Sequence, residues 1–257
     1  MTTTASGTPS RSEAAGASRG VPFGRLLRVE TRKLFDTRGN LVLSAVLLVL
    51  SLALVVGRSV VTGETRFFTL AGTAAIALGV LLPVLGVLTM TGEWSHRTAL
   101  TTFTLEPRRG RVLAAKCLSA GSAAVVVSLI SLLFAALVTA AHGGEARWGV
   151  DPLALLGWIA TMVLMTGEGL ALGLLLLNAP AAIVICLVSP MLWGFVARLG
   201  TTGETPASWL DLNATTNALM NADMSPTAAA QLATSALAWI VLPLAAGFLR
   251  VLRTDIR

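Results

Sequence analysis

The sequence predicts an all-α membrane protein with six membrane-spanning helices, and two observations lead to this fold class: the composition and the length of the apolar runs. Of the 257 residues, 54% are hydrophobic and only 12% are charged, and the mean hydropathy is +0.78. A water-soluble domain carries more charge on its surface. A spanning helix needs about 20 mostly apolar residues, and six runs meet or approach that length: 40–57, 68–90, 112–141, 153–177, 179–198 and 228–250. Unbroken runs such as LVLSAVLLVLSLALVV favour helices over the alternating pattern of a membrane barrel.

Residues 1–21 are predicted to form a disordered tail, because Thr, Ser, Ala and Gly dominate them and offer little apolar surface to bury. Residues 22–257 are predicted to form a single six-span domain. The first apolar run begins near Leu41, which is too far along the chain for a typical cleavable signal, so we expect no processing. Cys117 and Cys186 lie in separate apolar runs and indicate no disulfide framework.

The basic residues predict the orientation of the chain, since Lys and Arg are in excess in cytoplasmic loops near span ends. With six spans, 15 of the 19 basic residues fall on the side that holds both termini. Both termini are therefore predicted to be cytoplasmic. The anionic inner leaflet of the membrane accounts for the basic excess, so membrane lipid is an expected partner and nucleic acid is not. Seventeen arginines against two lysines, together with abundant alanine, suggest a bacterial chain and hence a bacterial plasma membrane.

Residues 22–38 are predicted to form an amphipathic helix that lies in the cytoplasmic membrane surface as an elbow before the first span. Helical projection places four apolar residues on one face and three arginines opposite: Phe23, Leu26, Leu27 and Leu34 against Arg25, Arg28 and Arg32. Glu30 falls on the apolar face, and Lys33 is its neighbour three residues on. This pair is either a local helix contact or part of a docking site.

Several residues mark helix ends and bends. Asp151 followed by Pro152 is a favourable helix start, and Asn178 predicts a tight turn before the fifth span. Prolines lie inside three apolar runs and predict bends there: Pro83, Pro190 and Pro243. Residues 199–227, the longest segment between spans on the outer side, either pack on the outer membrane surface or fold back over the spans.

Catalytic signatures are missing from the sequence. Neither lysine has the Gly and Ser or Thr neighbours of a phosphate-binding loop, so the chain is not expected to hydrolyse ATP by that route. His96 and His142 are predicted on opposite sides of the membrane, which excludes an intramembrane Ser-His pair and a histidine-rich metal site. We therefore expect no enzyme activity and no cofactor on this chain. Glu168, an ionisable residue within the fourth span, either lines a transport path or packs between helices near Gly167, Gly169 and Gly173.

The polar segment 91–116 completes a pattern that resembles the permease subunits of ATP-binding-cassette exporters of the type 2 family. The pattern consists of the elbow sequence VETRKLFDTR, six spans, and a cytoplasmic loop with Glu93, Thr98, Leu105, Pro107, Arg109 and Lys116 in order, and it covers residues 22–257. In this family the loop holds a short coupling helix that docks on a separate ATPase subunit. GEWSHRTALTTF is similar to that helix, and TLEPRRGRVLAAK to the break and the start of span three.

The resemblance implies a function and partners. The chain would export a peptide, antibiotic or other amphipathic compound, and antibiotic resistance is a common role in the family. Its partners would be an ATPase subunit that binds ATP and Mg and a second permease chain, identical or related. The alternatives are a non-transporting membrane anchor or sensor and a lipid-modifying enzyme.

The loop residues have separate expected roles in docking. Glu93 is expected at the N-terminus of the coupling helix, where it could meet a basic group of the ATPase. Trp94, Leu100 and Phe103 offer apolar anchors, and Pro107 would end the helix. The expected docking residues are Glu93, Trp94, Thr98, Leu100, Phe103, Pro107 and Arg109. An ordinary positively charged loop would explain the arginines but not the aromatic pair.

Overall fold

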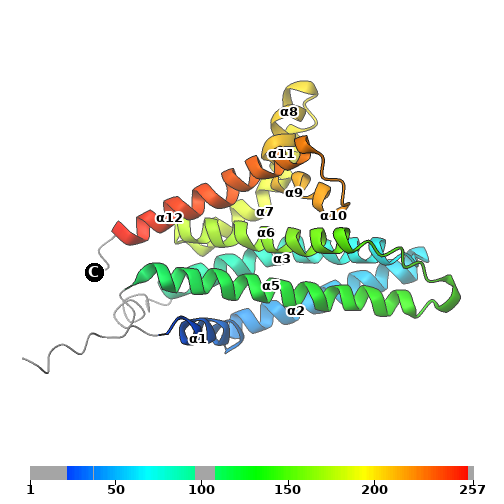
Figure 1. Ribbon diagram of the computed structural model, residues 1–257, viewed down its shortest axis with the longest axis horizontal. Coiled ribbons are helices and arrows are strands. Elements are labelled where there is room, and N and C mark those ends of the chain that lie inside the picture. Colours follow the sequence, from blue (N-terminus) through cyan, green and yellow to red (C-terminus); the bar gives the residue numbers. More distant parts are fainter. Residues whose placement is uncertain (1–21, 37, 96–107, 254–257) are drawn as a thin grey trace, which may run out of the picture.

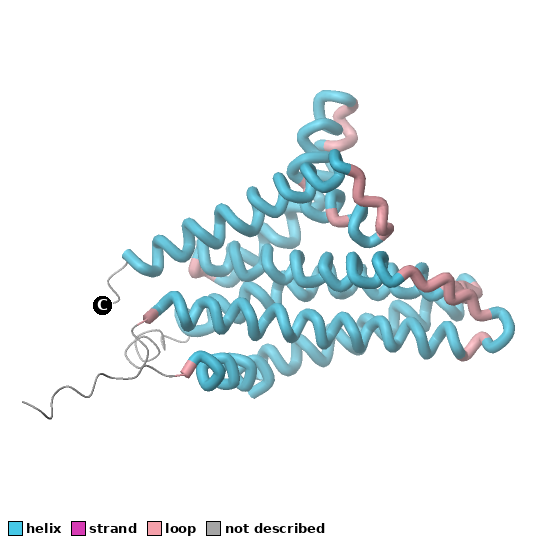
Figure 2. Tube along the Cα trace, viewed as in Figure 1, coloured by secondary structure: helices cyan, strands magenta, loops and turns pink. Residues whose placement is uncertain are grey.

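The computed structural model describes residues 22–36, 38–95 and 108–253, and almost all of them are helical (Figure 2). The longer helices are α1 (Phe23–Asp36), α2 (Arg38–Thr62), α3 (Phe67–Ser95), α5 (Arg109–Ala140), α6 (Pro152–Leu176), α7 (Ala179–Val196), α8 (Thr201–Leu210), α11 (Pro226–Ala236) and α12 (Leu242–Arg253). Shorter elements are a 3₁₀ turn (Gly143–Glu145), α9 (Leu212–Thr215), α10 (Asn217–Met220) and a π-helical turn (Leu237–Val241). Within these residues there is no strand beyond a one-residue bridge between Arg66 and Arg147.

Six helices are long and apolar enough to cross a membrane, which confirms the all-α, six-span prediction. They are Gly39–Thr62, Phe67–Glu93, Arg109–Ala140, Pro152–Leu176, Ala179–Val196 and Pro226–Arg253, the last of which joins α11, the π-helical turn and α12. The chain is a polytopic membrane protein. Two helices run about five residues beyond the predicted apolar runs, α2 to Thr62 and α3 to Ser95. Polar residues lower the hydropathy there without ending the helix, so hydropathy alone underestimates helix length.

The two central helices of the bundle are α3 and α6. In each of them 61% of the most apolar stretch is buried, against 17% for α2, α7 and the last span. Figure 1 shows α2, α3, α5 and α6 running along one another, while α12 slants away from them. The largest core cluster joins α2, α3, α5 and α6, and Trp158 and Met162 of α6 are fully buried in it. The peripheral helices therefore leave apolar faces exposed to lipid or to another chain.

Close contact between α3 and α6 depends on glycine. A Cβ on Gly169 would overlap the carbonyl oxygen of Pro83, and a Cβ on Gly86 would overlap that of Thr166. Gly173 lies against the backbone of Val87 in the same way. Small residues allow two membrane helices to approach at backbone distance. Gly167, by contrast, only meets the side chain of Ile240 at an ordinary 3.5 Å.

The predicted helix ends are confirmed. The Asp151 side chain accepts a hydrogen bond from Leu153 N (2.9 Å) at the start of α6, and the Asn178 side chain accepts one from Ala181 N (3.1 Å) at the start of α7. A π-helical turn directly precedes Pro243 in the last span. Because proline has no N–H and its ring crowds the preceding turn, a wider turn at this place relieves the helix.

Residues 199–227 fold back over the spans, the second of the two predicted arrangements. A Cβ on Gly157 of α6 would overlap the Leu219 carbonyl, so α10 lies directly on α6. The indole Nε1 of Trp239 donates to the Leu210 carbonyl (2.7 Å), and the hydroxyls of Thr215 and Ser235 are 2.7 Å apart. Helix α10 therefore lies on α6, while α8 and α9 pack against α11 of the last span, with α8 at the top of Figure 1.

Candidate functional site at the α1 end of the bundle

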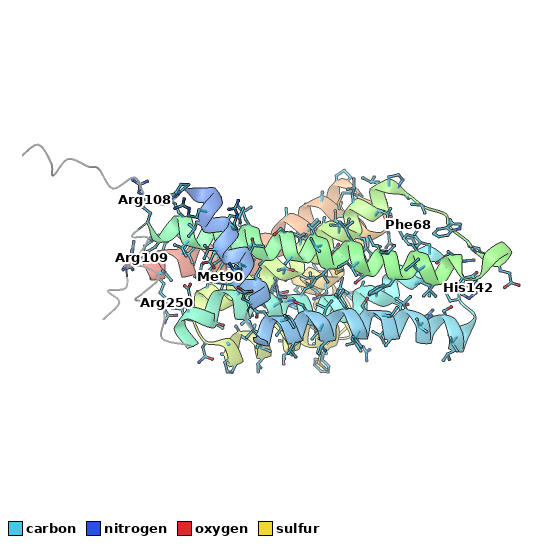
Figure 3. All side chains as sticks on the ribbon, turned by 90° about the horizontal axis from the view of Figure 1, so that it is seen from below. Phe68, Met90, Arg108, Arg109, His142 and Arg250 are labelled. Atoms are coloured by element: carbon cyan, nitrogen blue, oxygen red, sulfur yellow. The ribbon has the colours of Figure 1, made fainter. Side chains whose placement is uncertain are left out.

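Helix α1 lies at the end of the bundle where α3 ends and α5 begins, and we call this the α1 end. Leu26 and Leu34 of α1 are buried, and Leu26 packs with Met90 of α3 and Val112 of α5. The three arginines of the opposite face, Arg25, Arg28 and Arg32, are exposed. Figure 3 shows α1 crossing the bundle rather than running along it. The structure thus contains the amphipathic helix predicted within 22–38 as α1, Phe23–Asp36, with its apolar face against the spans.

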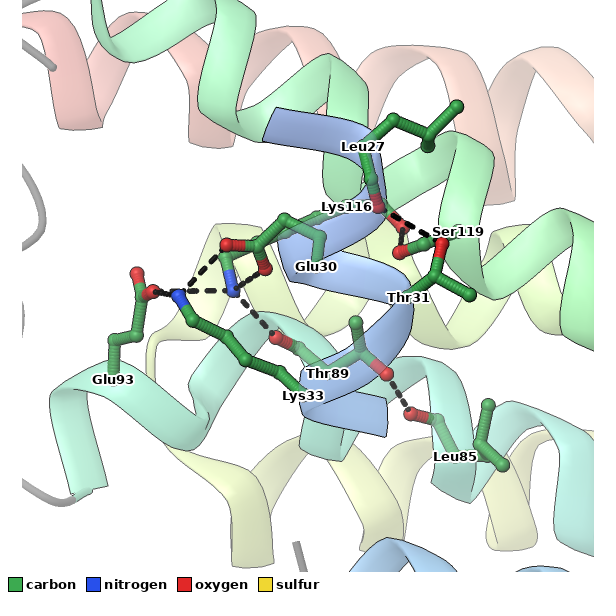
Figure 4. Close-up of polar contacts among 9 residues, drawn as sticks. All are labelled: Leu27, Glu30, Thr31, Lys33, Leu85, Thr89, Glu93, Lys116 and Ser119. Carbon is green, nitrogen blue, oxygen red and sulfur yellow. Dashed lines mark hydrogen bonds and ion pairs between the residues drawn. The ribbon is translucent and has the colours of Figure 1, made fainter. Parts of the chain in front are cut away.

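Four charged side chains meet at this end, and we call them the charge cluster: Glu30 and Lys33 of α1, Glu93 of α3 and Lys116 of α5 (Figure 4). The two carboxylate oxygens of Glu30 accept from Lys33 Nζ (2.7 Å) and Lys116 Nζ (2.9 Å). Glu93 Oε1 lies 3.1 Å from Lys33 Nζ and 3.3 Å from Lys116 Nζ. Each lysine therefore contacts both glutamates, and the cluster has no net charge.

Burial makes this arrangement costly to disturb. The Lys116 side chain is only 4% exposed, and both glutamates are also buried, whereas Lys33 is 45% exposed. Burial lowers the pKa of Lys33, but the hydrogen bond and charge of Glu30 and the charge of Glu93 outweigh it, so the pKa lies above its ordinary value. A buried charge without its partner is strongly unfavourable. The four side chains consequently fix α1, α3 and α5 in one arrangement.

The cluster extends one prediction and corrects another. Glu30 and Lys33 do form the local pair, but that pair is only half of the cluster. Glu93 was expected at the N-terminus of a coupling helix, whereas it lies near the C-terminal end of α3, which continues to Ser95. Glu93 Oε1 contacts two lysines of the same chain. Helix α3 continues without a break from Met90 to Ser95, so no new helix begins at Glu93.

The predicted docking residues Thr98, Leu100, Phe103 and Pro107 lie between Glu93 and Lys116 in the sequence. Thr98, Leu100, Phe103 and Pro107 fall outside the described residues, and for Trp94 only the backbone is described, within α3. The ion pair between Glu93 and Lys116 joins the last turn of α3 to the first turns of α5, the two helices that lie on either side of segment 96–107 in the sequence.

Arginines bind the carbonyl ends of helices around this site. Arg109 Nη1 donates to the Val251 carbonyl (2.6 Å), and Arg250 Nη1 donates to the Leu175 carbonyl (2.7 Å). These contacts satisfy carbonyls near helix ends, which lack partners within their own helix. Figure 3 shows Arg108, Arg109 and Arg250 at this end and His142 at the other. Arg109, a predicted docking residue, thus connects α5 to α12.

At the opposite end of the bundle, where α5 ends, the Ser59 and His142 side chains are in contact. Ser59 Oγ of α2 lies 3.1 Å from His142 Nε2, and His142 Nδ1 lies 2.9 Å from the Val138 carbonyl. The end of α2 therefore meets the end of α5, a contact that the positions of the two histidines in the sequence do not predict. Since Val138 supplies a carbonyl rather than a carboxylate, the contact resembles a structural tie more than a catalytic triad.

Among the described residues, no group of three or more His, Cys, Asp and Glu side chains could hold a metal ion.

Glu168 is buried in α6 and contacts the Ser189 hydroxyl of α7. The carboxylate of Asp211, which precedes α9, is near enough to interact with it electrostatically. Both readings of Glu168, packing and transport path, are compatible with this position, because the residue lies between helices and beside a second acidic group.

We expect Glu168→Gln to leave the unfolding temperature and membrane level nearly unchanged, since glutamine keeps the size and the hydrogen bond to Ser189. If Glu168 lines a transport path, ATP-dependent substrate flux into inverted vesicles should fall. Normal flux, or a loss of flux that follows a loss of protein, would show that Glu168 only packs.

Comparison with known proteins finds no matching family model and no curated protein of similar sequence. The class of the chain therefore follows from its fold: a polytopic membrane protein with a buried charge cluster that joins its N-terminal amphipathic helix to spans two and three.

Proposed function

We propose that the chain is the membrane-spanning permease subunit of an ATP-binding-cassette exporter. In this proposal the segment between α3 and α5 docks on a separate ATPase subunit, which binds ATP and Mg and supplies the energy. The chain itself carries no enzyme activity. It works in a bacterial plasma membrane with the α1 end and both termini in the cytoplasm, and it exports a peptide, antibiotic or other amphipathic compound.

The charge cluster is the observation that carries the proposal. A loop that is merely basic for reasons of topology needs arginines near the lipid headgroups, but it does not need buried ion pairs to two glutamates. The Glu93–Lys116 and Glu30–Lys116 pairs connect the helices before and after segment 96–107, α3 and α5, to α1. A force applied to this segment by a partner would therefore reach α1 and two spans together, as energy transfer from an ATPase requires.

Apolar faces of the peripheral helices support a second permease chain as a further partner. Large hydrophobic side chains are exposed along α2, α7 and the last span, among them Val49, Met191, Phe195 and Leu242. Lipid covers such faces in a monomer, and a second chain would cover part of them in the transporter. Exporter function requires a path between spans, which two chains can enclose.

Purification of the tagged chain from its own cells in mild detergent tests the proposal. We expect an ATPase with a Walker motif to copurify in a comparable molar amount, and the complex to hydrolyse ATP. A chain that copurifies with a different cytoplasmic protein, and without ATP hydrolysis, would instead be a membrane anchor or sensor.

A further inference from the structure

We propose that a pocket between α3, α6 and the α9–α10 segment binds a compact amphipathic amine in its protonated, cationic form. The pocket has a volume of about 390 Å³, which is at the small end of the range for ligand sites, roughly 300–1,000 Å³. Its polar and apolar walls are contributed by different elements. This inference names the substrate class of the proposed permease and to that extent rests on the proposed function.

The polar wall comes mainly from the segment that folds back over the spans. Asp211, Asn213, Thr216 and Asn217 line the pocket from this side, and Thr161 of α6 adds a hydroxyl. Asp211 Oδ1 accepts from Asn213 N (3.0 Å) at the start of α9, so the carboxylate is held in place by the backbone. Burial raises the pKa of Asp211 above its ordinary value, although backbone hydrogen bonds from Ala214 and Asn213 act in the opposite direction.

The charges around the pocket are acidic. None of the described side chains that line it is basic, and the Glu168 carboxylate is near enough to Asp211 for the two to repel each other. A cation that entered the pocket would relieve this repulsion, whereas an anion would increase it. The sign of the local charge therefore selects a cationic ligand.

A backbone carbonyl adds a further acceptor. Gly79 of α3 lines the pocket, and four residues later Pro83 has no N–H to donate to the Gly79 carbonyl. The helix thus leaves the carbonyl of Gly79, a residue that lines the pocket, without its usual donor. An ammonium group, which has several N–H donors and no acceptor, is suited to a wall of carboxylate, hydroxyl, amide and carbonyl oxygens.

The apolar wall suits a hydrocarbon body. Met162, Met165 and Met220 line the pocket, and methionine side chains adapt to ligands of different shape. The pocket is also deep: its α6 residues lie nine to thirteen positions after Pro152, or about 14–20 Å along the helix at 1.5 Å per residue. A ligand at this depth is amphipathic, because it must pass through or beside lipid and still present a charge to Asp211.

The test uses 4-phenylbutylammonium as the probe, with 4-phenylbutanol as its neutral analogue and 4-phenylbutyrate as its anionic one. The full chain is reconstituted in nanodiscs of phosphatidylcholine, without an ATPase, and binding is measured by titration calorimetry against empty nanodiscs. We expect the amine to bind, the alcohol to bind more weakly and the carboxylate not to bind. Equal binding of amine and carboxylate would overturn the proposal.

Two variants assign the binding to this pocket. Asp211→Asn should weaken amine binding by roughly tenfold or more, while the α9 cap is preserved because asparagine also caps helices well. Gly79→Leu should block the amine and the alcohol alike, since an added Cβ at Gly79 meets no atom within 4 Å and the side chain would fill the pocket. Unchanged unfolding temperatures show that each variant is folded.

Wild-type affinity for the amine in both variants would contradict the proposal. Because no ATPase is present, its failure is separate from that of the proposed function. An ATPase complex whose permease binds no amine would leave the permease assignment intact and remove only the substrate class. Amine binding by a chain that recruits no ATPase would support the amine site and remove the permease assignment.

Discussion

Replacing Lys116 with methionine should lower the free energy of unfolding by about 3–5 kcal/mol, the usual cost of breaking a buried ion pair by removing one partner. Lys116 contacts both Glu30 and Glu93 and is 4% exposed. Methionine fills a similar volume but leaves two buried carboxylates with only Lys33 between them. Unfolding by SDS in mixed micelles, followed by circular dichroism, measures the change.

Lys33→Met is the matched control, because Lys33 contacts the same two glutamates but is 45% exposed. Water can solvate the glutamates better once the Lys33 side chain is removed. The free energy of unfolding should therefore fall by clearly less than in Lys116→Met. Adding Glu30→Gln to Lys116→Met should recover part of the stability, since one carboxylate would then remain for one lysine. Equal losses for the two lysines would contradict the assigned geometry of the charge cluster.

Replacing Gly169 with alanine should destabilise the bundle by about 1–3 kcal/mol or more, the cost of overpacking a close contact. The added Cβ would overlap the Pro83 carbonyl, which belongs to the backbone of α3 and cannot rotate away. The two central helices would have to separate. The same SDS titration measures the effect.

Gly72→Ala provides a control of opposite sign. Gly72 also lies in α3, but an added Cβ there meets no atom within 4 Å. Alanine favours a helix over glycine by up to about 1 kcal/mol, so this change should be neutral or stabilising. If Gly169→Ala were equally harmless, α3 and α6 would not touch at this glycine.

The spans and helix starts could be predicted from the sequence because they depend on local properties. Run length and hydropathy identify the spans, and the Asp151–Pro152 pair identifies the start of α6. The buried position of Glu30 also followed from helical projection. The predicted segment 91–116 started too early because Gly92 and Glu93 lower the local hydropathy, although both residues still belong to α3.

Contacts between distant segments could not be predicted, since they depend on how helices cross. Glu30 and Lys116 are 86 positions apart, and Ser59 and His142 are 83 apart. One compositional signal could have found the charge cluster: both lysines of a chain with seventeen arginines belong to it. A compact ammonium fits between two carboxylates where a planar guanidinium would need more room. The pocket at Asp211 carried no such signal, because it exists only once α9 and α10 fold back on α6.

The proposal that the segment after α3 binds an ATPase is tested by changing Trp94, at the C-terminal end of α3, together with Phe103 of segment 96–107. In the purified complex, Trp94→Ala with Phe103→Ala should remove most of the ATPase, because aromatic anchors dominate small interfaces. Trp193→Ala with Phe195→Ala, the same change in the last turn of α7, should leave the ATPase bound. The measurement is the molar ratio of ATPase to chain, together with ATP hydrolysis. We expect this ratio to fall only for the first pair, at unchanged membrane level; full retention of the ATPase and of hydrolysis in that variant would show that the aromatic pair does not bind the ATPase.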